Sequence, residues 1–212
     1  NFNYSELHKT INDISFNGDI IYFIEEIRCF IEEIPYERIS LIAKTLIELT
    51  GFFDGYKTKM LFKSNAWDES VDLIFHILNK LKTKKEIYQI FISSIEQINI
   101  YGLGIIANML NSVDVAYFND NYENQKYKVL EKENLEECKI KLLNKIKKVM
   151  GTNQLWKIHS FYSIISLWES IDKVELEFSL KNLFSQDKNK LKFVCSIGNC
   201  WSGSKGIRWE FN

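Results

Sequence analysis

One proline and nine glycines are few turn-forming residues for a chain of 212 residues. An all-β sandwich or barrel needs frequent tight turns, where these two residues are concentrated, so the sequence disfavours such folds. Hydrophobic residues make up 46% of the chain and charged residues 26%, which is enough apolar material for a sizeable core. We therefore predict an all-α fold, an irregular array of about eight helices.

Apolar residues in the first half recur three and four residues apart, which is the period of an amphipathic helix. The first helix is expected to end before Pro35, and the second to end at Gly51 as its C-terminal cap. Between Tyr101 and Leu110 we expect only a short buried turn of helix, because Gly102 and Gly104 lower helix propensity. The expected core positions include Ile27, Phe30, Ile31, Ile34, Ile39, Ile42, Ala43, Leu46, Leu49, Val71, Ile74, Phe75, Leu78, Leu81, Ile87, Ile90, Phe91 and Ile95.

The chain is expected to hold two helical sets joined by an exposed connection. Residues 1–110 form the first set, and residues 111–134, rich in Asn, Asp, Tyr and Glu without a clear period, form the connection. Residues 135–212 form the second set, packed on the first as one compact unit. Its expected elements are helices over Leu135–Val149, Leu155–Trp168, Val174–Leu183 and Asp187–Ile197, with a short β element from Ile207 to Asn212.

Neither a membrane span nor a disulfide framework is expected. The longest apolar stretches fall short of the roughly 20 residues that cross a bilayer. The four cysteines are scattered, and the start of the chain has no signal-peptide pattern, so we expect a reduced, cytoplasmic setting. Because the sequence begins with Asn1, we expect it to be a fragment of a longer protein.

No motif predicts catalytic, cofactor-binding or metal-binding residues. The segment Gly51–Thr58 superficially resembles a phosphate-binding loop, but the spacing is wrong and the segment follows a helix, which favours a helix cap. Cys195 and Cys200 offer two zinc ligands where a structural site needs four. A self-contained hydrolase would need a pocket that joins His76 or His159 to a carboxylate.

Lysines are concentrated in one expected helix, although the formal net charge of the chain is −1. Residues 135–150 hold five lysines against two acids, and an alternative function is therefore a nucleic-acid-binding adaptor. Only three arginines occur in the chain and no aromatic residue interleaves with these lysines, so nucleic acid is disfavoured as a partner. The candidate contact residues are Lys139, Lys141, Lys145, Lys147 and Lys148.

Several blocks of the sequence together resemble the helical region after the P-loop core in KAP-family NTPases. They are Ile34–Ile39, Leu49–Asp54 and Val71–Leu81, and later Ile164–Glu169, Val174–Leu183 and Asp187–Ile197. The resemblance implies that a P-loop ATPase module precedes this region and that ATP and Mg²⁺ belong to that upstream module. The chain itself has no Walker motif.

The expected function follows from this resemblance and from the absence of a catalytic motif. We expect a non-catalytic helical sensor or assembly domain that contacts a protein partner or the NTPase module of its own protein. Some bacterial members of the family are implicated in excluding phage, so the resemblance also implies a role in bacterial phage defence.

Overall fold

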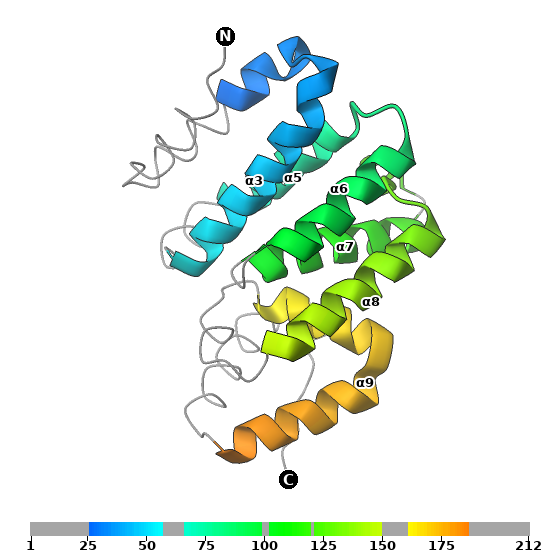
Figure 1. The fold of residues 1–212 in the computed structure, drawn as a ribbon. Helices are drawn as coiled ribbons and strands as arrows, with labels where there is room; N and C mark the ends of the chain where they lie inside the picture. The colour runs from blue at the N-terminus through cyan, green and yellow to red at the C-terminus, as the bar shows by residue number, and fades with distance from the viewer. Residues whose placement is uncertain (1–25, 57–65, 99–101, 120, 150–160, 187–212) are drawn as a thin grey trace.

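The computed structural model describes residues 26–56, 66–98, 102–119, 121–149 and 161–186, and throughout these ranges the fold is all-α (Figure 1). The chain therefore has the predicted multi-helix architecture. The expected β element at Ile207–Asn212 and the expected helix Asp187–Ile197 lie outside the described residues. The elements are η1 (Ile31–Glu33), α3 (Tyr36–Tyr56), α5 (Ala66–Leu78), α6 (Lys84–Gln97), α7 (Leu103–Phe118), η3 (Tyr122–Tyr127), α8 (Lys132–Val149) and α9 (Phe161–Gln186).

Helix α7 is the central element of the array. It packs against α3, α6, α8 and α9, while α5 packs against α3. Figure 1 shows α3, α6 and α8 following one another across the molecule, with α5 and α7 behind them and α9 below α8. Helices far apart in the sequence are therefore joined through α7.

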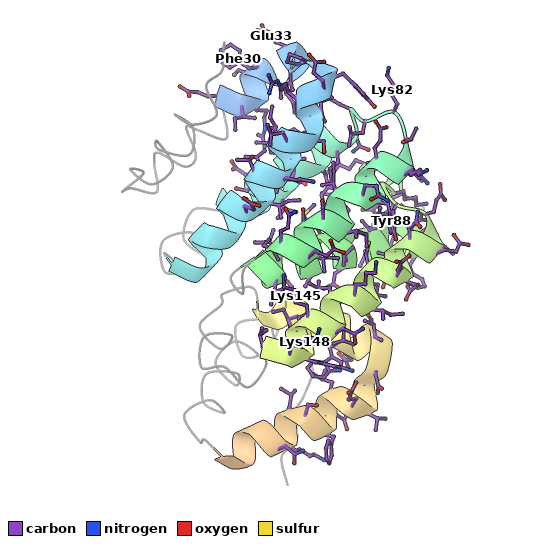
Figure 2. The ribbon with its side chains drawn as sticks, in the orientation of Figure 1. Phe30, Glu33, Lys82, Tyr88, Lys145 and Lys148 are labelled. Atoms are coloured by element: carbon purple, nitrogen blue, oxygen red, sulfur yellow. The ribbon has the colours of Figure 1, made fainter. Side chains whose placement is uncertain are left out.

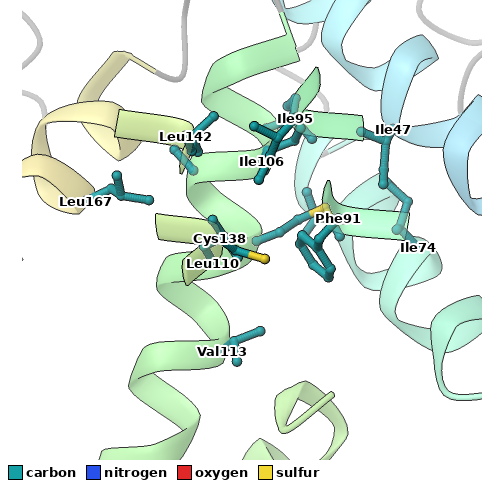
Figure 3. Close-up of a cluster of buried hydrophobic side chains, with 14 of the residues drawn as sticks. Ile47, Ile74, Phe91, Ile95, Ile106, Leu110, Val113, Cys138, Leu142 and Leu167 are labelled. Atoms are coloured by element: carbon teal, nitrogen blue, oxygen red, sulfur yellow. The ribbon is translucent and has the colours of Figure 1, made fainter. Parts of the chain in front are cut away.

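One continuous hydrophobic core runs from η1 to α9. Figure 3 shows the part of it that reaches from Ile47 of α3 to Leu167 of α9. In α7, Ile105, Ile106, Met109 and Leu110 are completely buried, as the sequence predicted. Their neighbours in the cluster come from both expected helical sets, so the sets share one core. The buried positions in the other elements include Ile39, Ile47, Ile74, Phe75, Ile90, Phe91, Cys138, Leu142, Ile164, Leu167 and Trp168. Phe30, expected in the core, is instead 56% exposed.

The expected exposed connection over residues 111–134 is wrong for much of its length. Helix α7 continues to Phe118, with Val113 and Ala116 buried, and the six residues of η3 follow it. Val129 and Leu130, just before α8, are also buried. Asn111 and Asp114, two of the polar residues that hid the period, are only partly buried.

The expectation that the second helix ends at Gly51 is wrong. Helix α3 continues through Gly51 to Tyr56. A glycine inside a helix costs only about 1 kcal/mol, so a buried helix can continue through one. Nearby packing supports this, because Thr50 is buried and its Oγ1 donates a 2.7 Å hydrogen bond to the Leu46 carbonyl oxygen.

Helix α9 bends at Asp172, where the backbone leaves the helical region with φ −151° and ψ 88°. The Asp172 Oδ1 accepts a hydrogen bond of 2.9 Å from the Glu175 backbone N–H, as an N-cap side chain does. The bend lies between the two helices expected up to Trp168 and from Val174, so α9 consists of two helical segments.

No described helix is long and apolar enough to span a bilayer.

Candidate functional site

Lys139, a candidate nucleic-acid contact, lies inside the protein with 3% of its surface exposed. Its Nζ lies 3.1 Å from Asp114 Oδ2 on α7 and 3.3 Å from Glu136 Oε1 on α8. This ion pair joins two helices, and it leaves Lys139 unable to reach a ligand in solvent.

Lys145 caps the C-terminal end of α6. Its Nζ donates hydrogen bonds of 2.6 Å, 3.0 Å and 2.6 Å to the carbonyl oxygens of Ile95, Glu96 and Ile98. Helix C-terminal carbonyls have no partner in their own helix and carry partial negative charge, so a cation stabilises them. Burial lowers the pKa of Lys145, since a desolvated ammonium is costly.

The other three lysines of α8 differ in their surroundings. Lys147 pairs with Glu175 on α9 and lies over the Trp168 ring, 5.7 Å from its centroid. Lys141 is exposed and pairs within α8 with Glu137 at 2.9 Å. Lys148 is exposed near the end of α8 (Figure 2). The five lysines therefore do not form a continuous cationic strip.

A polar cleft of about 510 Å³ lies beside η1, at the end of the array opposite α9 (Figure 1). Its charged lining comes from three segments: the helical residues 26–30 together with η1, α5 with the turn after it, and η3. These charged and titratable residues are Arg28, Glu32, Asp72, His76, Lys80 and Lys126, and we refer to this site as the polar cleft.

Glu32 is the hub of one side of the polar cleft. Its Oε2 lies 2.7 Å from Lys80 Nζ, and its Oε1 lies 3.8 Å from His76 Nε2. The Lys80 ammonium, through its hydrogen bond and its charge, lowers the pKa of Glu32. The exposures of the partners are unequal, because the Glu32 side chain is 78% exposed and that of Lys80 only 20%.

Asp72 organises the other side of the polar cleft. It accepts a 2.5 Å hydrogen bond from the Tyr127 hydroxyl and lies 3.3 Å from Lys126 Nζ. Tyr127 packs edge-on against the buried Phe75 at a centroid distance of 4.8 Å, and burial raises the pKa of its hydroxyl. Asn79 donates hydrogen bonds to the carbonyl oxygens of Phe75 and Lys126. These contacts hold η3 and its Lys126 against α5.

The polar cleft brings His76 near a carboxylate, the arrangement that a hydrolase would require. Its described lining contains no Ser, Thr or Cys to act as a nucleophile. Among the described residues no group of three or more His, Cys, Asp or Glu could hold a metal ion. His159, Cys195 and Cys200 lie outside the described residues.

Large apolar side chains are exposed on the second segment of α9. Val174 is 79% exposed and Phe178 66% exposed, and they lie one helical turn apart on one side of the helix. Leu176 and Leu180 of the same segment are buried in the core. This segment therefore carries apolar residues on two faces, only one of which packs against the described core.

Sequence reasoning did not identify the polar cleft. Glu32, Asp72 and Lys126 are about 40 to 95 positions apart and belong to no motif, so only folding brings them together. Compared with known proteins, the chain matches no family model, no curated protein and no solved structure.

Proposed function

We propose that this chain is a non-catalytic helical interaction domain that binds a protein partner through the second segment of α9. The exposed pair Val174 and Phe178 carries the proposal. Burial of apolar surface favours protein association, and aromatic residues are common anchors of protein interfaces.

The partner that we propose is an NTPase module of the same protein. The resemblance of the helical blocks to the region after the P-loop core in KAP-family NTPases supports this assignment. In that arrangement the helical domain biases the activity of the module, and ATP and Mg²⁺ bind only there. A role in bacterial phage defence and a cytoplasmic location are parts of the same proposal.

The reading frame that encodes the chain and its flanking sequence supplies the first test. An upstream segment with a Walker A motif supports the proposal, whereas a complete frame without any NTPase module contradicts it. The upstream module is then purified and titrated with the fluorescently labelled chain.

Variants of the chain test the surface itself. We expect V174E/F178E to weaken binding of the module at least tenfold, because two charged groups would be desolvated in the interface. The matched control is F118E, which changes a residue with 82% exposure at the end of α7. Unchanged binding by the double variant, with native circular dichroism, would refute the role of this surface.

A hydrolase is the second candidate function, and the contact between His76 and Glu32 favours it. His76 would act as general base on a bound water, and the Glu32 carboxylate would stabilise the imidazolium. The test is release of p-nitrophenol from p-nitrophenyl acetate and p-nitrophenyl phosphate. Turnover that disappears in H76Q would support a hydrolase, and equal rates for both proteins would contradict it.

A further inference from the structure

The polar cleft combines more positive than negative charge with a built framework. Arg28, Lys80 and Lys126 supply three permanent cations against the two carboxylates of Glu32 and Asp72, and His76 adds a cation when protonated. The hydrogen bonds of Asn79 and Tyr127 hold the Lys126 side of the cleft in place. Its volume of about 510 Å³ lies in the range of small-molecule sites.

We propose that the polar cleft binds a small anion with two or more negative charges carried by phosphate groups, with Lys80, Arg28 and Lys126 as its contacts. This inference is independent of the proposed interaction function. It assigns a ligand site to the opposite end of the helical array from the Val174 surface.

A phosphate ligand can replace the carboxylate partners of the lysines in the cleft. Lys80 is largely buried, yet its carboxylate partner Glu32 is mostly exposed, so solvent screens the attraction between them. Asp72 and Lys126 are each about half exposed, and their closest approach is 3.3 Å. Ion pairs with an exposed partner contribute little to stability, so a stronger anion displaces them at little cost.

Phosphate fits these cations better than another carboxylate does. A phosphate group carries more charge than a carboxylate at neutral pH and presents three acceptor oxygens. The planar guanidinium of Arg28 can donate two parallel hydrogen bonds to one phosphate group, while lysines act as point charges. Two linked phosphates can engage both lysine-bearing sides of the cleft.

The experiment is isothermal titration of the whole chain with inorganic pyrophosphate at low ionic strength. We expect saturable binding with one site per chain. The double variant R28A/K80M should weaken it at least tenfold, and E32Q should tighten it severalfold, because the ligand no longer competes with the Glu32 carboxylate. The matched control is K148M, an exposed lysine of α8 that should leave the affinity unchanged.

Opposite effects of E32Q and R28A/K80M, together with an unchanged affinity of K148M, support the site. Non-specific attraction to a cationic surface would be weakened in K148M as well. Absence of saturable heat with pyrophosphate up to about 1 mM would overturn the proposal, since that corresponds to less than about 4 kcal/mol of binding free energy. Equal weakening by K148M would overturn it too. Circular dichroism and thermal unfolding of each variant separate loss of binding from loss of fold.

Discussion

Single buried polar groups decide several helix contacts of this protein. Lys139 is the charged residue that the described structure buries most deeply. Its partner Asp114 comes from α7, so the pair fixes how α8 lies on the central helix. A buried charge that loses its partner remains desolvated, which makes the loss expensive.

Replacement of Asp114 by Ala should lower the free energy of unfolding by about 2–3 kcal/mol, because Lys139 would stay buried without its main partner. E136A removes the second partner, whose side chain is 57% exposed, and should cost less than about 1 kcal/mol. Urea unfolding followed by circular dichroism measures both changes. Equal costs for the two variants would contradict the unequal roles of these carboxylates.

Cys138 should make the protein less stable at alkaline pH. Burial in the core raises the pKa of its thiol to about 12, whereas an unfolded cysteine ionises near pH 8.5–9. Below the lower pKa the thiol is protonated in both states, and its full contribution to stability is present. As pH rises from about 9 toward 12 only the unfolded state ionises, so the free energy of unfolding falls.

The measurement compares urea unfolding of the wild type and C138A between pH 7 and pH 10. Above pH 9 the wild type should lose stability faster than C138A, by up to about 1.4 kcal/mol per pH unit. Tyrosines with raised pKa values affect both proteins alike. Parallel curves for the two proteins would show that Cys138 ionises as easily in the folded state as in the unfolded one.

At the scale of elements, α6 has a side-chain cap at each end. Thr83 and Glu86 form a capping box at its start, in which each side chain bonds to the backbone of the other residue. Lys145 of α8 binds three carbonyl oxygens at its end. The second cap comes from a residue about 50 positions away, so it also joins α8 to α6.

Replacement of Lys145 by Met should lower the free energy of unfolding by about 1–3 kcal/mol. The variant keeps the alkyl stem but leaves the carbonyl oxygens of Ile95, Glu96 and Ile98 without their charged donor. The matched control is K141M, which removes an exposed pair within α8 and should change the stability much less. Similar denaturation midpoints for both variants would refute the capping role.

The start of α7 has room only for glycine. A Cβ at Gly102, its N-cap residue, would collide with the Cδ1 and Cγ1 atoms of Ile98. We therefore expect G102A to lower the free energy of unfolding by about 1–3 kcal/mol through overpacking. I98A leaves a cavity at a buried position, and the double variant G102A/I98A should be more stable than the sum of the single changes predicts. Additive effects would contradict the collision.

At the scale of the whole molecule, the charge distribution argues against binding of nucleic acid. The formal net charge is −1, and three of the five candidate lysines of α8 are engaged in contacts between helices. Nucleic-acid binding depends on cations that are free to neutralise phosphates.

We therefore expect no saturable binding of a 20-base-pair DNA or RNA duplex at 50 mM salt, measured by fluorescence anisotropy up to about 0.1 mM protein. Binding that weakens steeply with salt and disappears in K141E/K148E would reverse this expectation and support the adaptor function instead. Both substitutions change exposed residues, so the fold of the variant should be unaffected.

Most of the helices could be predicted because apolar periodicity is a local property. The core residues Ile87, Ile90, Phe91 and Ile95 of α6 are all buried as expected. The end of α7 was missed because Asn111, Ser112 and Asp114 make the segment look like a loop. Asn111 donates a hydrogen bond to the Ser163 carbonyl oxygen of α9, and Asp114 pairs with Lys139. Their polar groups therefore serve contacts between helices.

By itself, the sequence determined the all-α class and the buried face of helices such as α6, because both depend on residues three and four positions apart. Only the tertiary structure decided which lysines of α8 remain exposed and that Arg28, His76 and Lys126 share one cleft. Those outcomes depend on contacts between segments about 25 to 100 positions apart, for which the local pattern carries no signal.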